Sequence, residues 1–250
     1  MNSNHLKQNL NKTEVMFIGK KKDLKTHNLQ ISFDDNHVYK SSVAQSVKFL
    51  GAHIDASLTM NLAISYCVRQ CNFSLKKLKT IKFILGTNHK LLLVKAFITS
   101  KIDYCNILLC TKSANQLQPL QIVLNQSVRF AYNLGRRESV TPSMKAAHIL
   151  PVVYRVKFKS CVFVYKILNE LAPNYLQGIV EIQPTSICFL RSSEDWLKLS
   201  NSAGYMNCIQ GAMVKNWNYL PLTVRCQENI KLFKKHLKTH YFSLAYPSIL

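Results

Sequence analysis

The chain has 250 residues and a formal net charge of +21, because 33 Lys and Arg stand against 12 Asp and Glu. It is 48% hydrophobic and has only seven Gly and seven Pro, which excludes a disordered chain, a flexible linker and a collagen. So large a basic excess favours a polyanionic partner (RNA, DNA or an anionic membrane surface) over a surface whose charge serves solubility alone.

The sequence predicts an intracellular protein, of the cytoplasm or the nucleus. Its strongest apolar run, residues 91–98, is interrupted by Lys95 and is far shorter than the roughly 20 residues of a membrane-spanning helix. The first residues are polar and lack the apolar core of a secretory signal. The eight cysteines contain no CxxC pair, and no second pair with zinc spacing joins Cys67 and Cys71. We therefore expect buried, reduced thiols and no metal site.

The first part of the chain is predicted to form short β-strands. Residues 13–19 are a compact apolar run that ends at a glycine and a charged turn. Residues 29–33 alternate apolar and polar side chains, and a turn-forming Asp-Asp-Asn sequence separates them from residues 37–40, their predicted hairpin partner. Residues 46–55 are predicted to form a last strand, in which Gly51 indicates a bulge or a close backbone approach.

After this strand the hydrophobic period changes to 3.6 residues, which predicts helices. Gly86 is expected to end the first helix and Asn88 to cap the second. Pro119 is tolerated only in the first turn of the third helix, and Gly135 is expected to end that helix.

Two further signals mark the second half of the chain. Thr141 is expected to cap a helix whose next residue is a proline, and Pro151 is expected to break or restart it. The pattern as a whole predicts an α+β fold that is mainly α-helical, with small antiparallel β-hairpins at the N-terminus followed by a helical bundle. The expected helices cover about 58–85, 88–110, 117–133, 141–170 and 226–241, and residues 180–215 are too weakly periodic to assign.

The sequence Phe33-Asp34-Asp35 is the first candidate for chemistry. Polymerases that hold two Mg²⁺ ions place paired aspartates on a hairpin after an aromatic residue. Such a site also needs a third carboxylate on an earlier strand, and only Glu14 and Asp23 precede the pair, neither in a matching strand. A polar β-turn is the favoured interpretation, and no metal ligand is predicted.

Other catalytic patterns are absent from the sequence: it contains no GxSxG, HExxH, GxxxxGK[ST] or GxGxxG. His53 and His148 are expected to be core or surface residues and not catalytic bases. Asp103 lies inside an apolar helical segment, where a carboxylate must find partners, and we expect a structural hydrogen bond to the end of a neighbouring helix. No catalytic residue is assigned.

Two clusters of basic residues are the stronger signal. Each places several cations within two helical turns, so that each helix can neutralise several phosphates and release their counterions. The alternative for either cluster is an ordinary solvated helix face. The predicted nucleic-acid-binding residues are Arg69, Lys76, Lys77, Lys79, Lys82, Lys231, Lys234, Lys235 and Lys238.

Eight short segments extend in order from about residue 2 to residue 246: SNHLKQNLNKTEVMFIG, VKFLGAHID, SKIDYCNILL, LQPLQIVLNQSVRFAYNL, TPSMKAAHILPVVYRVKFK, KILNELAPNYL, NWNYLPLTVR and FKKHLKTHYFSLAY. Together they resemble the part that follows the catalytic hairpin in reverse transcriptases of non-LTR (LINE-type) retrotransposons, particularly the Jockey-like group. The resemblance implies three regions: 1–56 as the end of a β-rich palm, 57–135 as a helical thumb, and 136–250 as a helical C-terminal region. It also implies that the thumb grips a template–primer duplex.

The chain departs from this family where the family does its chemistry. The aromatic-x-Asp-Asp box of the family precedes the segment that Lys12, Thr13 and Glu14 match, so it would fall before Met1. Asp34 and Asp35 follow that segment and align with a turn. Mg²⁺ would therefore belong only to a complete enzyme, and this chain is expected to have no cofactor.

The sequence thus predicts a truncated RNA-directed DNA polymerase. It keeps the thumb and C-terminal region for binding a template–primer (RNA/DNA) duplex through non-specific phosphate contacts, and it does not polymerise. The alternative is a protein-interaction or structural module, a captured transposon remnant in which a partner covers the exposed palm face. A reading frame without function is a third possibility. No membrane partner is expected.

Overall fold

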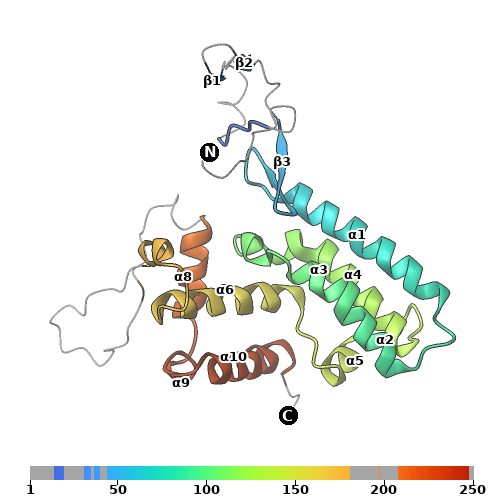
Figure 1. The fold of residues 1–250 in the computed structure, drawn as a ribbon. Helices are drawn as coiled ribbons and strands as arrows, with labels where there is room; N and C mark the ends of the chain where they lie inside the picture. Colours follow the sequence, from blue (N-terminus) through green and yellow to red (C-terminus); the bar gives the residue numbers. More distant parts are fainter. Residues whose placement is uncertain are drawn as a thin grey trace, which may run out of the picture. The chain divides into compact units, whose positions relative to one another are not determined.

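The computed structural model describes residues 14–19, 31–34, 37–39, 44–180, 197 and 208–247 (Figure 1). The chain divides into two compact units, Met1–Tyr66 and Cys67–Leu250. The regions 57–135 and 136–250, which the resemblance separates as thumb and C-terminal region, largely share the second unit. Their assignment to parts of a polymerase stays a prediction.

The first hairpin consists of β1 (Ile31–Asp34) and β2 (His37–Tyr39), which pair antiparallel. It confirms the hairpin that the alternating pattern predicts, and Asp35 of the Asp-Asp pair lies outside the described residues. The strand predicted at residues 13–19 is wrong for the described part, because residues 14–19 form no strand.

The second hairpin replaces the single strand predicted over residues 46–55. Strand β3 (Ser46–Phe49) pairs antiparallel with β4 (Ala52–Asp55), and the two central loop residues Leu50 and Gly51 have φ angles of 46° and 88°. Two consecutive positive φ angles are typical of the tightest hairpin loops, and glycine adopts them without strain. Gly51 therefore marks the turn of a hairpin and not a bulge within one strand.

The carboxylate of Asp55 organises the exit from β4. It accepts hydrogen bonds from the backbone N–H groups of Thr59 (2.8 Å) and Met60 (2.7 Å) and from the hydroxyls of Thr59 (2.7 Å) and Ser57 (3.3 Å). Burial disfavours the charged carboxylate, yet the four hydrogen bonds outweigh it and lower the pKa of Asp55 below its ordinary value of 3.8. Helix α1 (Asn61–Thr80) therefore begins after this turn, three residues later than predicted.

The end of α1 also differs from the prediction. The helix stops at Thr80, and the chain continues in turns closed by bonds such as Ile84 N–H to the Ile81 carbonyl (3.2 Å). Gly86 occupies the N-cap position of the next helix. The predictions that Gly86 ends the first helix and that Asn88 caps the second are therefore both wrong.

The second predicted helix is a composite of α2 (Thr87–Val94), the π-helix η4 (Lys95–Thr99) and α3 (Ser100–Asp103). It ends at Asp103 and not near residue 110, because Tyr104 is extended and Cys105 has a φ of 49°. A short 3₁₀ helix, η5 (Asn106–Leu109), follows.

Helix α4 (Ala114–Tyr132) starts at a capping box formed by Ser113 and Gln116. Because it starts earlier than predicted, Pro119 lies beyond its first turn; the proline is exposed there, so water can hydrate the carbonyl that it leaves unbonded. The left-handed residue that ends the helix is Asn133 (φ 57°), and not Gly135.

Helices α5 (Thr141–Ala146) and α6 (Val152–Leu168) are separated by Pro151, which confirms the predicted break. Val140 holds the N-cap position of α5, so Thr141 is its first helical residue and not its cap. The 3₁₀ helix η6 (Asn174–Ile179) follows α6.

Three helices complete the described chain. Helix α8 (Ile209–Asn218) lies partly within the stretch that the sequence leaves unassigned, and α9 (Leu222–Arg225) is short. Helix α10 (Ile230–Ala245) begins four residues later than predicted, since the Asn229 side chain accepts the N–H of Lys231 (2.7 Å) and caps it.

Helix α6 is the centre of the second unit and packs against α4, α8 and α10 (Figure 1). Its Tyr165 ring stacks on Phe233 of α10 at 4.3 Å, and Trp217 of α8 approaches the same Phe233 ring at 5.7 Å. The α+β class with a large helical part is confirmed. Among the described helices, none is long and apolar enough to span a bilayer.

The turn at Asp55 gives a first prediction. Replacing Asp55 by Asn removes the charge that four donors share, and we expect the local opening free energy to fall by about 1–2 kcal/mol. Hydrogen exchange of the Thr59 and Met60 amides would measure this loss. Because the folded pKa of Asp55 lies below its ordinary value, the difference from wild type should be full above pH 3.8 and vanish as pH falls through the folded pKa.

Glu138→Gln is the matched control, since Glu138 accepts the N–H of Gly135 in the other unit (2.8 Å). It should leave the exchange of the Thr59 and Met60 amides unchanged. Equal exchange in the Asp55→Asn variant and wild type at pH 7 would contradict the assignment.

Candidate nucleic-acid interface

The middle of the chain is depleted of acidic residues. Residues 56–169 contain 17 Lys and Arg but only two acids, Asp103 and Glu138. Glu138 accepts a backbone N–H in the loop after α4, and Asp103 pairs with an arginine. Neither acid forms an ion pair with a surface lysine in the described part of the chain.

Helix α1 displays one of the predicted basic clusters. Arg69, Lys76, Lys77 and Lys79 are exposed on it, as the sequence predicts. Lys82 is half-buried and lies in the turns beyond the helix end, so it does not continue the helical face.

An exposed aromatic ring accompanies these cations. The Phe73 side chain is 58% exposed, and the Lys77 ammonium lies 4.5 Å from its ring centroid. A cation over an aromatic face is the usual geometry of a cation–π contact. Exposed aromatic and basic side chains on one helix are the two components from which sequence-tolerant nucleic-acid surfaces are built.

The opposite face of α1 is fixed to the composite helix. Leu75 and Leu78 are buried, and the Cys71 thiol donates to the Ile98 carbonyl (3.8 Å). The Lys101 ammonium donates to the Ser74 hydroxyl at 2.7 Å. These contacts hold the basic face of α1 toward solvent.

Helix α10 displays the second cluster. Lys231, Lys234, Lys235 and Lys238 are spaced i, i+3, i+4 and i+7, so they share one side of the helix, and all four are exposed. The buried residues of α10 are Phe233, Leu237 and Tyr241. Whereas α1 is fixed to α3 and η4, α10 packs on α6 and α9, so the two clusters rest on different supports.

The Asp103 carboxylate meets Arg155 of α6 in a bidentate ion pair. The Arg155 Nε donates to Asp103 Oδ1 (2.8 Å) and Nη2 donates to Oδ2, and the Asn106 amide adds a longer bond to Oδ1 (3.4 Å). Both side chains are largely buried, at 17% and 23% exposed for Arg155 and Asp103. The prediction of a structural role for Asp103 thus holds in kind, but its partner is a guanidinium and not a helix end.

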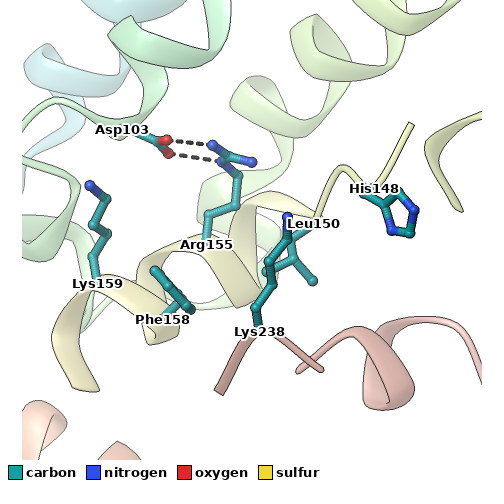
Figure 2. Close-up of a pocket in the computed structure, with 7 residues that line it drawn as sticks. All are labelled: Asp103, His148, Leu150, Arg155, Phe158, Lys159 and Lys238. Carbon is teal, nitrogen blue, oxygen red and sulfur yellow. Dashed lines mark hydrogen bonds and ion pairs between the residues drawn. The ribbon is translucent and has the colours of Figure 1, made fainter. Parts of the chain in front are cut away.

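A pocket of about 310 Å³ lies against this ion pair (Figure 2). Arg155 and Lys159 come from α6, one helical turn apart, and Lys238 reaches the pocket from α10. Its complete lining is Asp103, His148, Leu150, Arg155, Phe158, Lys159 and Lys238.

One of the predicted binding residues, Lys238, belongs to the lining of this pocket. Sequence reasoning missed Arg155, Lys159 and His148. The i, i+4 spacing of Arg155 and Lys159 was a visible signal, but nothing in the sequence indicates that α10 packs beside them.

No group of three His, Cys, Asp or Glu side chains gathers as metal ligands among the described residues. Burial raises the pKa of both Cys110 and Cys161 to about 12, which makes these thiols poor nucleophiles. The prediction that the cysteines are buried holds for Cys71 and Cys161. Cys67, Cys110 and Cys208 are only partly buried, Cys105 and Cys226 are exposed, and Cys188 lies outside the described residues.

Comparison of the chain with protein-family models, curated proteins and solved structures gives no significant match.

The ion pair gives a second prediction. Asp103→Asn leaves a largely buried guanidinium without its charge partner, and we expect a loss of about 2–4 kcal/mol in unfolding free energy, measured by urea denaturation. Arg155→Lys keeps the positive charge but cannot form the bidentate pair, so its loss of unfolding free energy should be smaller than that of Asp103→Asn.

A double-mutant cycle tests the coupling. The Asp103→Asn/Arg155→Gln variant should be destabilised by clearly less than the sum of Asp103→Asn and Arg155→Gln. Additive losses would show that the two side chains act independently.

Proposed function

We propose that this chain is the thumb and C-terminal part of a LINE-type reverse transcriptase, and that it binds an RNA/DNA template–primer duplex without copying it. The observation that carries the proposal is the excess of 15 positive charges over residues 56–169, with both acids of that stretch engaged in structural contacts. A surface of this kind attracts a polyanion over a long range and at any sequence.

The ion pair supports the family part of the proposal. Asp103 belongs to the segment SKIDYCNILL and Arg155 to the segment ending in LPVVYRVKFK, the two segments whose resemblance to the family includes an Asp and an Arg. In the structure these residues bind each other, and Asn106 of the first segment donates to the same carboxylate. The resemblance thus includes residues that act together, and it does not rest on isolated matches alone.

The exposed clusters support the binding part. The cations of α1 project from a helix whose other face is buried, so they can reach phosphates without a change of fold. Phe73 adds an aromatic surface among them. Contacts between lysines and phosphates hold a duplex by its backbone and do not read its sequence.

The salt dependence of binding tests this function. With a 20-base-pair RNA/DNA hybrid, fluorescence anisotropy between 50 and 200 mM KCl should give steeply salt-dependent binding, with a dissociation constant of roughly 10⁻⁴ to 10⁻⁶ M near physiological salt. Lys76→Ala/Lys77→Ala/Lys79→Ala should lower the slope of log K against log salt by about 2–3, because each lost phosphate contact removes roughly 0.9.

Arg136→Ala/Arg137→Ala/Lys145→Ala is the matched control: it removes three exposed cations outside both clusters. It should lower the slope by less than the α1 variant does. Equal slopes for the two triple variants would mean that α1 is not the interface, and salt-insensitive binding would refute the phosphate mechanism.

A primer-extension assay tests the claim that the chain does not polymerise. With Mg²⁺, a primed RNA template and deoxynucleotides, we expect no extended product, because the family's aromatic-x-Asp-Asp box has no counterpart in the position required. Processive extension by the purified chain, abolished by Asp34→Asn/Asp35→Asn, would contradict both the inactivity and the interpretation of Asp34 and Asp35 as a turn.

An interaction module is the second candidate function, and one observation favours it. Phe49 and Leu50 at the tip of the second hairpin are 63% and 80% exposed, and Phe83 and Ile84 after α1 are 94% and 84% exposed. Apolar side chains in such positions are typical of surfaces that bind a partner. The α1 triple variant separates the two functions, since a module that binds protein through these apolar residues gives the same salt slope for the α1 variant and for the Arg136→Ala/Arg137→Ala/Lys145→Ala control.

A further inference from the structure

The pocket beside the ion pair has a surplus of positive charge. Asp103 and Arg155 neutralise each other, which leaves Lys159 and Lys238, and the described structure gives neither lysine an ion pair. His148 lies at the same pocket with a φ of 51°, in the turn that leads to α6. Two unpaired ammonium groups directed at one recess favour an anionic ligand.

Arg155 offers further donors to such a ligand. A guanidinium has five N–H groups, and Asp103 occupies one on Nε and one on Nη2. Among the described residues no acceptor takes the remaining three. Because Asp103 holds the guanidinium plane in place, these donors are fixed before a ligand arrives, and fixed donors lose little entropy on binding.

The size of the pocket limits the ligand. A volume of about 310 Å³ is at the lower end of the range for small-molecule sites and far too small for a duplex. Phe158 and Leu150 give it an apolar wall, and an aromatic ring is a surface on which a base can stack. One nucleotide has the required size and both kinds of surface.

We propose that this pocket binds the terminal phosphomonoester of a nucleic-acid strand, together with the nucleotide that carries it. A terminal phosphate has a charge of about −1.5 to −2 at neutral pH, which matches the two unpaired lysines, whereas an internal phosphodiester has only one negative charge. A strand as the source of the phosphate rests on the proposed function, but the recognition of a phosphomonoester rests on the pocket alone.

The test compares three single strands of one sequence, with a 5′-phosphate, a 3′-phosphate or no terminal phosphate. We expect the wild-type chain to bind at least one phosphorylated strand about five- to tenfold more tightly than the unphosphorylated strand, as two ion pairs to exposed lysines provide. The identity of the preferred strand assigns the end. Lys159→Gln/Lys238→Gln should abolish the preference, and inorganic phosphate should compete for it.

Lys231→Gln/Lys234→Gln is the matched control, because it removes two charges from α10 away from the pocket lining. It should weaken all three strands alike and keep their ratio. Circular dichroism of both variants should match wild type, since all four lysines are exposed.

The failures of the two proposals are distinguishable. Tight but equal binding of the three strands would overturn the pocket assignment and leave the proposed function standing. Binding of none of the strands would overturn the strand as the source of the phosphate, and the titration with the RNA/DNA hybrid would then decide the proposed function by itself. Capture of vesicles containing phosphatidylinositol phosphates, without any preference among the strands, would assign the phosphomonoester to a lipid and overturn the strand-end proposal.

Discussion

The pairing of Asp103 with Arg155 is the constraint on which the second unit depends. Asp103 ends the composite helix at the point where the backbone turns through an extended Tyr104 and a left-handed Cys105. Arg155 lies in the first turns of α6, the helix against which α4, α8 and α10 pack. A guanidinium and a carboxylate joined by two bonds fix distance and orientation together. The pair therefore sets how the composite helix meets the centre of the unit, and the basic pocket forms beside it.

The same pair explains how so basic a chain can fold with few acids. In residues 56–169 both carboxylates hold the backbone or a neighbouring helix in place. Asp103 pairs with Arg155 at a helix junction, and Glu138 accepts the N–H of Gly135 in the loop after α4. The surface cations have no such partners in that stretch, and their mutual repulsion is reduced only by solvent and salt. A bound polyanion would reduce the same repulsion. The same uncompensated charge therefore affects both stability and binding. The lysines of α1 do not disturb the core, because they lie on the face opposite to the buried Leu75 and Leu78.

The hydrophobic period was enough to predict the fold class, because it depends on neighbouring residues alone. Leu75 and Leu78, for example, are spaced to share one helix face, and both are buried in the structure. Helix ends were predicted poorly, because they depend on capping groups that compete at neighbouring positions. Asn133 takes the left-handed conformation expected near Gly135, and Ser113 starts α4 before Pro119 can fall in the first turn. The partner of Asp103 lies 52 positions away, and no local pattern encodes that contact. For the same reason the exposed lysines were predictable residue by residue, whereas the pocket that gathers Lys159 with Lys238 was not.

The exposed clusters and the pocket obey different physics, and this difference gives them separate roles. Charges on the exposed faces of α1 and α10 act through water, so each contributes little and salt screens it. They can hold any polyanion, but they cannot distinguish one phosphate from another. The pocket lies against the largely buried, fixed guanidinium of Arg155, so the donors of that side chain are less screened than the exposed lysines and they are directional. It responds to the feature by which a strand end differs from the rest of the strand, a doubly charged phosphate with unesterified oxygens. Long-range attraction by the helices would bring a nucleic acid to the surface, and the pocket would then determine which part of the strand stays there.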